Sequence, residues 1–164
     1  IKRCYEEGKE NILIFEDDAR FNLPIDIDKV MRVINWLQVS DNWEIFYFGS
    51  IPILSYPINS FIMRSYKPYL AHCYSLNRKG MKKILENNEL YNYHYDVKIR
   101  NMSNLKKYVI FPSINNQVVA PGDYNRSSVS KFIPFKGMTI LIEYLFFLLI
   151  PILIIIYIMI KKTK

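Results

Sequence analysis

An apolar run over residues 138–160 places the strongest constraint on what this chain can fold into. At the rise of an α-helix its 23 residues reach about 34 Å, enough to cross the hydrocarbon core of a bilayer. A buried core helix is usually shorter and keeps a polar stripe, which this run lacks. The sequence therefore predicts one transmembrane helix over 138–160, with the lipid bilayer as a partner. A basic linker over 131–137 would precede it, and a short basic tail over 161–164 would follow it.

Residues 1–130 remain for one folded domain, and the charge of the chain indicates no nucleic-acid partner. The net charge is +7, and five lysines close to the apolar run account for much of it, namely Lys131, Lys136, Lys161, Lys162 and Lys164. The other basic residues are scattered among acids and form neither a basic stripe nor a recognisable nucleic-acid module. Cys4 and Cys73 are too few for a disulfide framework, and with His72 and His94 they do not have the spacing of a zinc site.

The lysines that follow the apolar run outnumber those just before it, which favours a cytosolic tail. The final KKTK resembles a di-lysine signal for retrieval to the endoplasmic reticulum, although a plain stop-transfer cluster explains the same lysines equally well. Sequons at Asn101 and Asn125 would require a lumenal domain, but such sequons also arise by chance in an Asn-rich chain. We expect a single-pass protein of the endoplasmic reticulum or Golgi, with a lumenal domain.

Three consecutive acids end a short apolar segment near the start of the chain. Residues 12–15 predict a strand buried on both faces, and Glu16, Asp17 and Asp18 follow it directly. In open α/β sheets, ligands bind outside the carboxyl ends of the strands, so carboxylates placed there point towards a site. Adjacent carboxylates repel one another unless they are solvated, paired with a base or bound to a hard divalent cation. On this pattern alone, a solvated turn between the strand and a helix, with Asp18 or a neighbour as helix cap, is the more common explanation of the acids, and a cation site is the alternative.

The remaining patterns alternate between helices and strands, which predicts an α/β fold. Asp26 and Asn77 have the residue type and position of helix N-caps. Gly49 ends an aromatic strand at a point where a backbone can approach a ligand closely. The expected elements are a helix over 27–39, a strand over 43–48, an irregular excursion or distorted hairpin over 52–68, a strand over 69–76, a helix from 78 and a strand over 108–112.

The segment ILIFEDDARF resembles the acidic motif of glycosyltransferase family 25, which includes bacterial lipooligosaccharide and procollagen galactosyltransferases. Two further blocks match in the same order: Tyr74 with Asn77 and the KGMKKIL helix start, and then Asp96 ahead of a short helix. Met81 departs from the small residue expected at its position. The resemblance covers about residues 12–117. It implies a GT-A-like, Rossmann-like glycosyltransferase domain over 1–130 that lacks its N-terminal, nucleotide-binding part.

The resemblance also implies a chemistry, namely transfer of a hexose such as galactose from a nucleotide-sugar donor, a UDP-sugar, to a hydroxyl of a protein or glycan. Mn²⁺ or another divalent cation would assist. Asp17 and Asp18 would hold the metal, and Glu16 would join them in binding the cation and donor. Asp96 would be the catalytic base or help to bind the donor. From the residues alone, Asp96 is also readable as a helix cap, and His94 as either a cation ligand or a structural histidine.

A second hypothesis belongs to a different functional class. The chain would be a catalytically inactive, membrane-tethered glycosyltransferase remnant that acts as a binding or interaction module. Its 13 tyrosines and 10 phenylalanines would provide the binding surface, although core packing explains most aromatic residues in a folded domain.

Overall fold

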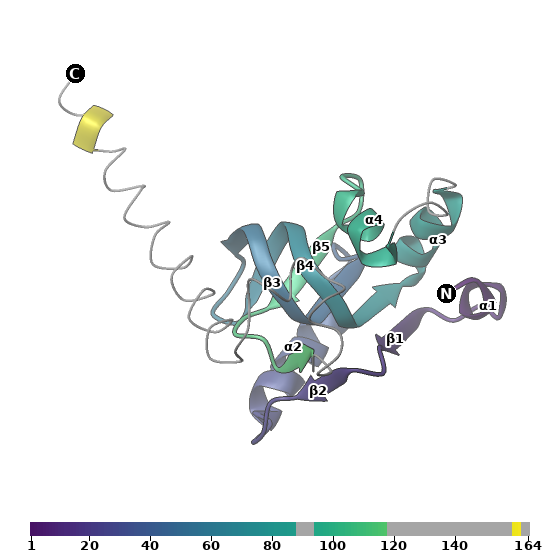
Figure 1. Cartoon of the computed structure of the whole chain (residues 1–164), viewed down its shortest axis with the longest axis horizontal. Coiled ribbons are helices and arrows are strands. Elements are labelled where there is room, and N and C mark those ends of the chain that lie inside the picture. Colours follow the sequence, from purple (N-terminus) through teal and green to yellow (C-terminus); the bar gives the residue numbers. More distant parts are fainter. Residues whose placement is uncertain (88–93, 118–158, 162–164) are drawn as a thin grey trace, which may run out of the picture. The chain divides into compact units, whose positions relative to one another are not determined.

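The computed structural model describes residues 1–87, 94–117 and 159–161 (Figure 1). The chain divides into two compact units, residues 1–119 and 120–164. The predicted linker over 131–137 and most of the predicted transmembrane helix lie outside the described residues, although 159–161 are helical. Within the described ranges, no helix combines the length and the apolar character needed to span a membrane.

The first unit is a mixed α/β domain built on a four-stranded sheet with the order β1-β4-β3-β5. These strands are β1 (Asn11–Phe15), β3 (Ile45–Pro57), β4 (Ile62–Asn77) and β5 (Lys107–Ile110). β4 is antiparallel to β1 and β3, whereas β5 is parallel to β3, so the sheet is mixed. A separate antiparallel pair joins β2 (Ala19–Phe21) to β6 (Asn115–Gln117). The predicted α/β class is confirmed at this level, and the arrangement is compatible with a Rossmann-like domain.

β1 lies at an edge of this sheet and buries only one of its two faces. The prediction that this strand is buried on both faces is therefore wrong. Among the described strands it pairs only with β4. Ile12 and Ile14 pack against the core, whereas the side chains between and after them are open, with Leu13 53% and Phe15 49% exposed. A continuous apolar run is typical of a strand covered on both sides. Here only the face that carries Ile12 and Ile14 is covered within the described part of the chain.

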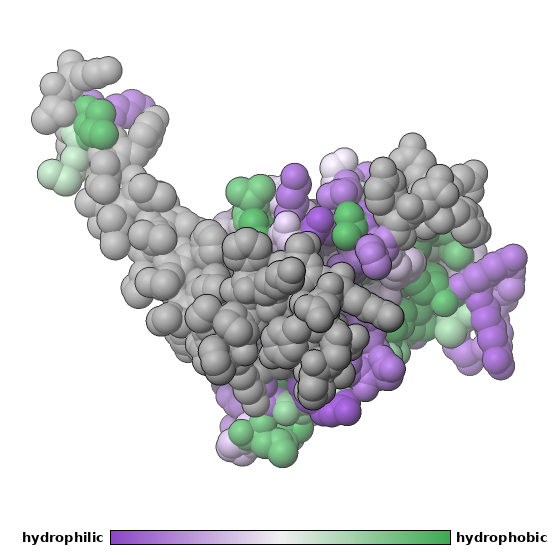
Figure 2. Space-filling view, viewed as in Figure 1, coloured by the Kyte–Doolittle hydropathy of each residue, from purple (hydrophilic) through white to green (hydrophobic). Residues whose placement is uncertain are grey.

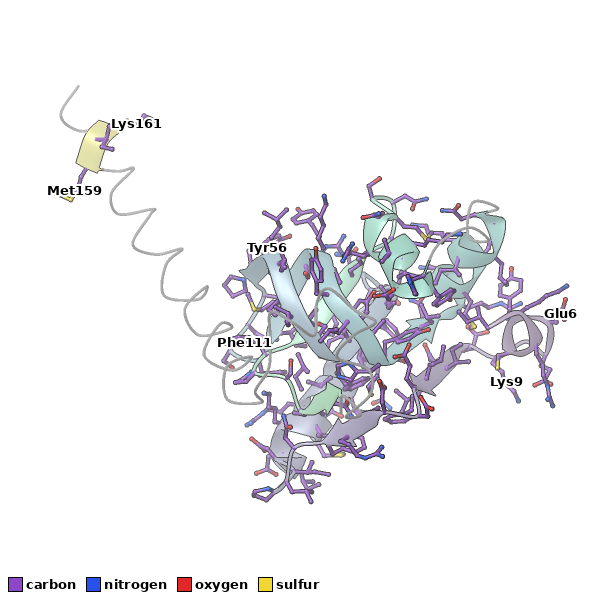
Figure 3. All side chains as sticks on the ribbon, viewed as in Figure 1. Glu6, Lys9, Tyr56, Phe111, Met159 and Lys161 are labelled. Atoms are coloured by element: carbon purple, nitrogen blue, oxygen red, sulfur yellow. The ribbon has the colours of Figure 1, made fainter. Side chains whose placement is uncertain are left out.

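The excursion predicted over 52–68 is the outer half of the long β3–β4 hairpin, which confirms the distorted-hairpin alternative. The two strands stay paired as far as Pro57 and Met63, and the register shifts on both sides of Gly49. Tyr56 and Tyr66 stack across the outer half with ring centroids 6.2 Å apart. Figure 3 shows Tyr56 near this end of the hairpin, whereas Glu6 and Lys9 lie around α1 (Lys2–Glu6) at the opposite end of the unit.

The other helices are α2 (Ile27–Val39), α3 (Arg78–Glu86) and α4 (Tyr95–Asn101). Both predicted N-caps are confirmed, because the Asp26 side chain accepts a hydrogen bond from the Lys29 amide and the Asn77 side chain accepts one from the Gly80 amide. The alternative role of Asp96 as a helix cap is not observed. α4 begins one residue before Asp96, with His94 at the N-cap position, so Asp96 lies in the first turn.

Two apolar cores hold the helices and strands together. The first joins the sheet to α3 and α4, and Tyr47, Leu76, Met81 and Ile99 are buried in it. The second lies where Val33 of α2 packs with residues that include Trp43, Phe46, Ile62 and Tyr108.

α2 is buried over less of its surface than its apolar spacing predicts. Val33 is completely buried, but Ile27 and Met31 are 62% and 50% exposed. Leu23, in the turn before the helix, is 79% exposed. In Figure 2 an apolar patch appears at the lower edge of the view, where Figure 1 shows α2 and the chain that leads into it. The second apolar side of the helix therefore has no cover among the described residues.

Candidate functional site

The acids Glu16, Asp17 and Asp18 form a turn between β1 and β2 that is fixed at both ends. The Glu16 amide donates to the His72 carbonyl oxygen at 2.9 Å, and the Ala19 amide donates to the Glu16 carbonyl oxygen at 3.1 Å. Beyond the turn, β2 pairs with β6 from Ala19 onwards. These backbone contacts hold the three acids, hereafter the acidic turn, against His72 within β4 and beside β6.

The fold brings Asp96 within electrostatic range of the acidic turn, although it is far away in the sequence. The pKa of Glu16 is raised, first because its carboxyl group loses hydration and then because Asp18, Asp96 and Asp17 repel its negative charge. Within the described part of the chain, no salt bridge involves Glu16, Asp17 or Asp96. The site therefore carries a concentration of negative charge that favours a cation.

The nearest guanidinium group does not neutralise these carboxylates. Arg20 Nη1 donates to the backbone carbonyl oxygens of Asp17 and Ala19, at 3.1 and 2.9 Å. This arrangement stiffens the turn through its backbone and leaves the carboxylate of Asp17 for another partner.

Three tyrosines beside Asp96 were not predicted as part of a site. Burial, followed by the nearby Tyr95 and Asp96, raises the pKa of Tyr47, and burial with Tyr95 likewise raises the pKa of Tyr74. Tyr74 and Tyr95 lie close enough to influence each other's ionisation, and burial raises the pKa of Tyr95 to about 12. All three phenols are therefore protonated at neutral pH and able to donate hydrogen bonds. The tyrosines around His94 were the available sequence signal for Tyr95, whereas Tyr47 carried none beyond its strand pattern.

Two buried polar residues beside the acidic turn, His72 and Asn115, were also missed. They are 2% and 1% exposed, and His72 Nε2 lies 3.3 Å from the Asn115 carbonyl oxygen. Among the residues that the structure describes, His72 Nδ1 and both polar side-chain atoms of Asn115 have no hydrogen-bond partner. Burial lowers the pKa of His72, with opposing effects from Asn115 and Asp18, so the ring is neutral at neutral pH. A histidine inside an apolar strand was the only sequence signal for this pair.

At Gly49 the backbone is approached closely, as predicted, but by His72 and Asn115 of the protein itself. A Cβ atom on Gly49 would lie 2.2 Å from His72 Nε2 and 2.6 Å from the Asn115 carbonyl oxygen. His94, the other histidine considered as a cation ligand, is exposed at the start of α4. The interior histidine, rather than the exposed one, therefore lies next to the acidic turn.

The donor atoms at the acidic turn fit a cation that shares its coordination with a ligand. Among the described residues, no three side chains of the His, Cys, Asp and Glu types form a group that could hold a metal by themselves. Mg²⁺ and similar hard cations usually take one or two protein carboxylates and complete their shell with water and substrate phosphates. Asp17 and Asp18 supply that kind of donor set, which suits a cation bound together with a diphosphate.

A separate cleft of about 400 Å³ lies at the start of α2 and is not lined by these acids. It contains the basic side chains of Lys29 and Arg32, and Lys29 Nζ donates to the Pro112 carbonyl oxygen. Arg32 also lies over the ring of Phe61, 5.6 Å from its centroid. These contacts explain the basic residues as packing and capping groups of the cleft wall.

Neither a protein-family model nor a curated protein sequence matches this chain. The resemblance to glycosyltransferase family 25 therefore consists of the three sequence blocks described above. In the structure, the acidic turn lies near an additional carboxylate, Asp96, and near a set of protonated phenols.

Proposed function

We propose that the chain is a metal-assisted glycosyltransferase of the GT-A type that moves a hexose from a UDP-sugar to a hydroxyl of a protein or glycan, with inversion at the anomeric carbon. One observation carries this proposal: the acidic turn and Asp96 come from distant segments, yet both act on the carboxyl group of Glu16. Charge of this density is unfavourable unless a ligand compensates for it. The order of the three sequence blocks supports the same reaction class.

We assign roles to the residues from the family resemblance, and their positions are compatible with these roles. Asp17 and Asp18 would bind a divalent cation, which when present supplies Lewis-acid stabilisation of the leaving diphosphate. Asp96 would accept the proton of the acceptor hydroxyl while that oxygen forms its bond to the anomeric carbon and the nucleoside diphosphate departs. Tyr74 and Tyr95, which lie close to each other, would orient hydroxyl groups of the substrate. Glu16 would add negative charge for the cation and its donor.

The test is sugar transfer by the full chain in the presence of Mn²⁺, UDP-galactose and a panel of glycan and peptide acceptors. We expect Asp18→Asn and Asp96→Asn each to reduce transfer by about a hundredfold or more. Asp41→Asn is the matched control, because Asp41 is an exposed acid in the turn before β3. Wild-type turnover that survives loss of both Asp17 and Asp18 would exclude this mechanism.

One observation favours the alternative of an inactive binding module. Leu13 and Phe15 of β1 leave an apolar surface open, and Phe21 of β2 extends it, since its ring lies 5.7 Å from that of Phe15. Exposed apolar surface of this kind is common at protein interfaces. A chain that binds a partner through this surface and shows no donor hydrolysis or transfer with any hexose nucleotide would support the alternative over the enzyme.

We also propose that residues 138–160 anchor the domain to a membrane, on the strength of the sequence pattern alone. The expected location is the endoplasmic reticulum or Golgi, with the domain in the lumen. Extraction of cell membranes with alkaline carbonate tests the anchor, because a spanning helix keeps the chain in the membrane pellet. Release into the supernatant would contradict it.

A further inference from the structure

His72 and Asn115 carry hydrogen-bonding capacity that the described protein does not use. Both residues are more than nine-tenths buried, yet the second ring nitrogen of His72 and the whole side-chain amide of Asn115 lack partners. Buried polar groups of folded proteins are almost always satisfied by protein, ordered water or an ion. The unsatisfied atoms of these two residues are therefore available to an ordered water or a bound ion.

These two side chains lie directly beside the acidic turn. His72 receives the hydrogen bond from the Glu16 amide through its own carbonyl oxygen, and its Nε2 lies 3.3 Å from the carbonyl oxygen of Asn115. Asn115 in turn pairs with Phe21 in the strand that follows the acids. The carboxylate of Asp18 is close enough to act electrostatically on the His72 ring. Backbone contacts thus hold His72 and Asn115 beside the acidic turn.

We propose that the divalent cation of this site is bound by Asp18 together with two interior ligands, the Asn115 side-chain oxygen and His72 Nδ1. This inference rests on the proposed function, because it assigns protein ligands to the same cation. The set combines an anionic carboxylate, a neutral amide oxygen and a neutral imidazole, all of which are known ligand types for Mn²⁺-like metals.

The proposal also predicts that Asp18 and Asp17 contribute unequally to binding of the cation. Asp18 is partly buried, whereas Asp17 is exposed. With interior ligands on the cation, Asp18 is the carboxylate whose loss abolishes metal binding, and Asp17 contributes from the solvent side. The measured loss of Mn²⁺ affinity should therefore be larger for Asp18→Asn than for Asp17→Asn.

The direct test is pulsed electron paramagnetic resonance of Mn²⁺ bound to the full chain, with affinities from Mn²⁺ titration. We expect a nitrogen hyperfine coupling from the imidazole in the wild type. It should disappear in His72→Gln and persist in His94→Gln, the matched control on the exposed histidine. His72→Gln and Asn115→Ala should each weaken Mn²⁺ binding at least about tenfold, and the circular dichroism spectrum of each variant checks that it folds.

The wild-type spectrum keeps the proposal falsifiable even if both variants misfold, because ¹⁵N-labelled histidine must change the coupling pattern. Mn²⁺ that binds without nitrogen coupling, or whose coupling is lost only in His94→Gln, overturns the interior ligands and leaves the glycosyltransferase proposal standing. Nitrogen coupling through His72 in a chain that transfers no sugar would support the interior ligands and overturn the glycosyltransferase proposal. A wild-type chain that binds no Mn²⁺, with or without UDP, overturns both.

Discussion

The amide nitrogen of Glu16 donates a 2.9 Å hydrogen bond to the carbonyl oxygen of His72, one residue beyond the end of β1. The bond continues the β1–β4 pairing into the acidic turn, since Phe15 is already paired with Cys73. The backbone of Glu16 therefore continues the sheet, whereas its side chain is part of the acidic turn. Changes in the packing of β4 are consequently expected to reach the acids directly.

Gly49→Ala is predicted to destabilise the domain through this packing. The added Cβ would lie 2.2 Å from His72 Nε2 and 2.6 Å from the backbone oxygen of Asn115, so the strands must shift. We expect a loss of about 2–3 kcal/mol in the free energy of unfolding, measured with urea. A double-mutant cycle with His72→Ala should reveal a coupling of about 1 kcal/mol, because the smaller side chain relieves one of the two contacts. Strictly additive effects would contradict the predicted contact.

Lys83→Met is predicted to cost about 2–3 kcal/mol of folding stability, because it leaves a buried carboxylate without its cation. Lys83 Nζ lies 2.7 Å from Glu44 Oε1, and the Glu44 side chain is only 6% exposed. Lys82→Met is the matched control on the same helix. Lys82 lies 3.7 Å from Glu86 in a pair that is largely solvated, so its loss should cost less than about 0.5 kcal/mol. Equal costs for the two variants in thermal unfolding would rule out the buried pair as the cause.

The raised pKa of Glu16 predicts a specific dependence of stability on pH. The folded state holds the Glu16 proton to higher pH than the unfolded state, whose glutamate has a pKa near 4.5. Stability therefore falls as the pH rises from 4.5 through the folded-state pKa. Glu16→Gln removes this contribution, so the variant should gain thermal stability relative to the wild type towards neutral pH and none at pH 3. Glu10→Gln changes an exposed acid just before β1 and is the control. Its thermal stability should differ from that of the wild type by the same amount at every pH.

Two neighbouring substitutions in β1 test the one-sided burial of this strand. Ile14 packs against the core, so Ile14→Thr should lose about 1–2 kcal/mol of unfolding free energy. Leu13 is 53% exposed, and Leu13→Thr should change it by less than about 0.5 kcal/mol. Chemical unfolding of the full chain measures both. A large loss for Leu13→Thr would mean that the open face is covered in the intact protein.

Local signals predicted the parts of the fold that depend on a few adjacent residues. Asp26 and Asn77 were identified as caps because a side-chain oxygen before a helix bonds an amide three residues later. The exposure of Leu13 and the one-sided burial of α2 could not be predicted in this way. They depend on which elements lie opposite, and the residues in question are as apolar as any core residue.

The candidate site was predictable only where the sequence itself carries the acids. Glu16, Asp17 and Asp18 were recognised from their run, and Asp96 through the family resemblance. Their electrostatic proximity arises from the tertiary fold. His72 and Asn115 were missed because their common burial depends on β4 and β6 meeting behind the turn, which no spacing within one segment reveals.

The pairing of β1 with β4 affects how the chain folds during its synthesis. β1 is synthesised before its partner strand β4, which follows only after α2 and β3, and β6 comes later still. Long-range pairing of this kind slows folding, because a large loop must close before the contact is gained. The apolar segment of β1 therefore has no partner strand until β4 has been synthesised, and the turn that follows β1 is completed only when β6 can pair with β2. Chaperone engagement is expected to concentrate in that interval.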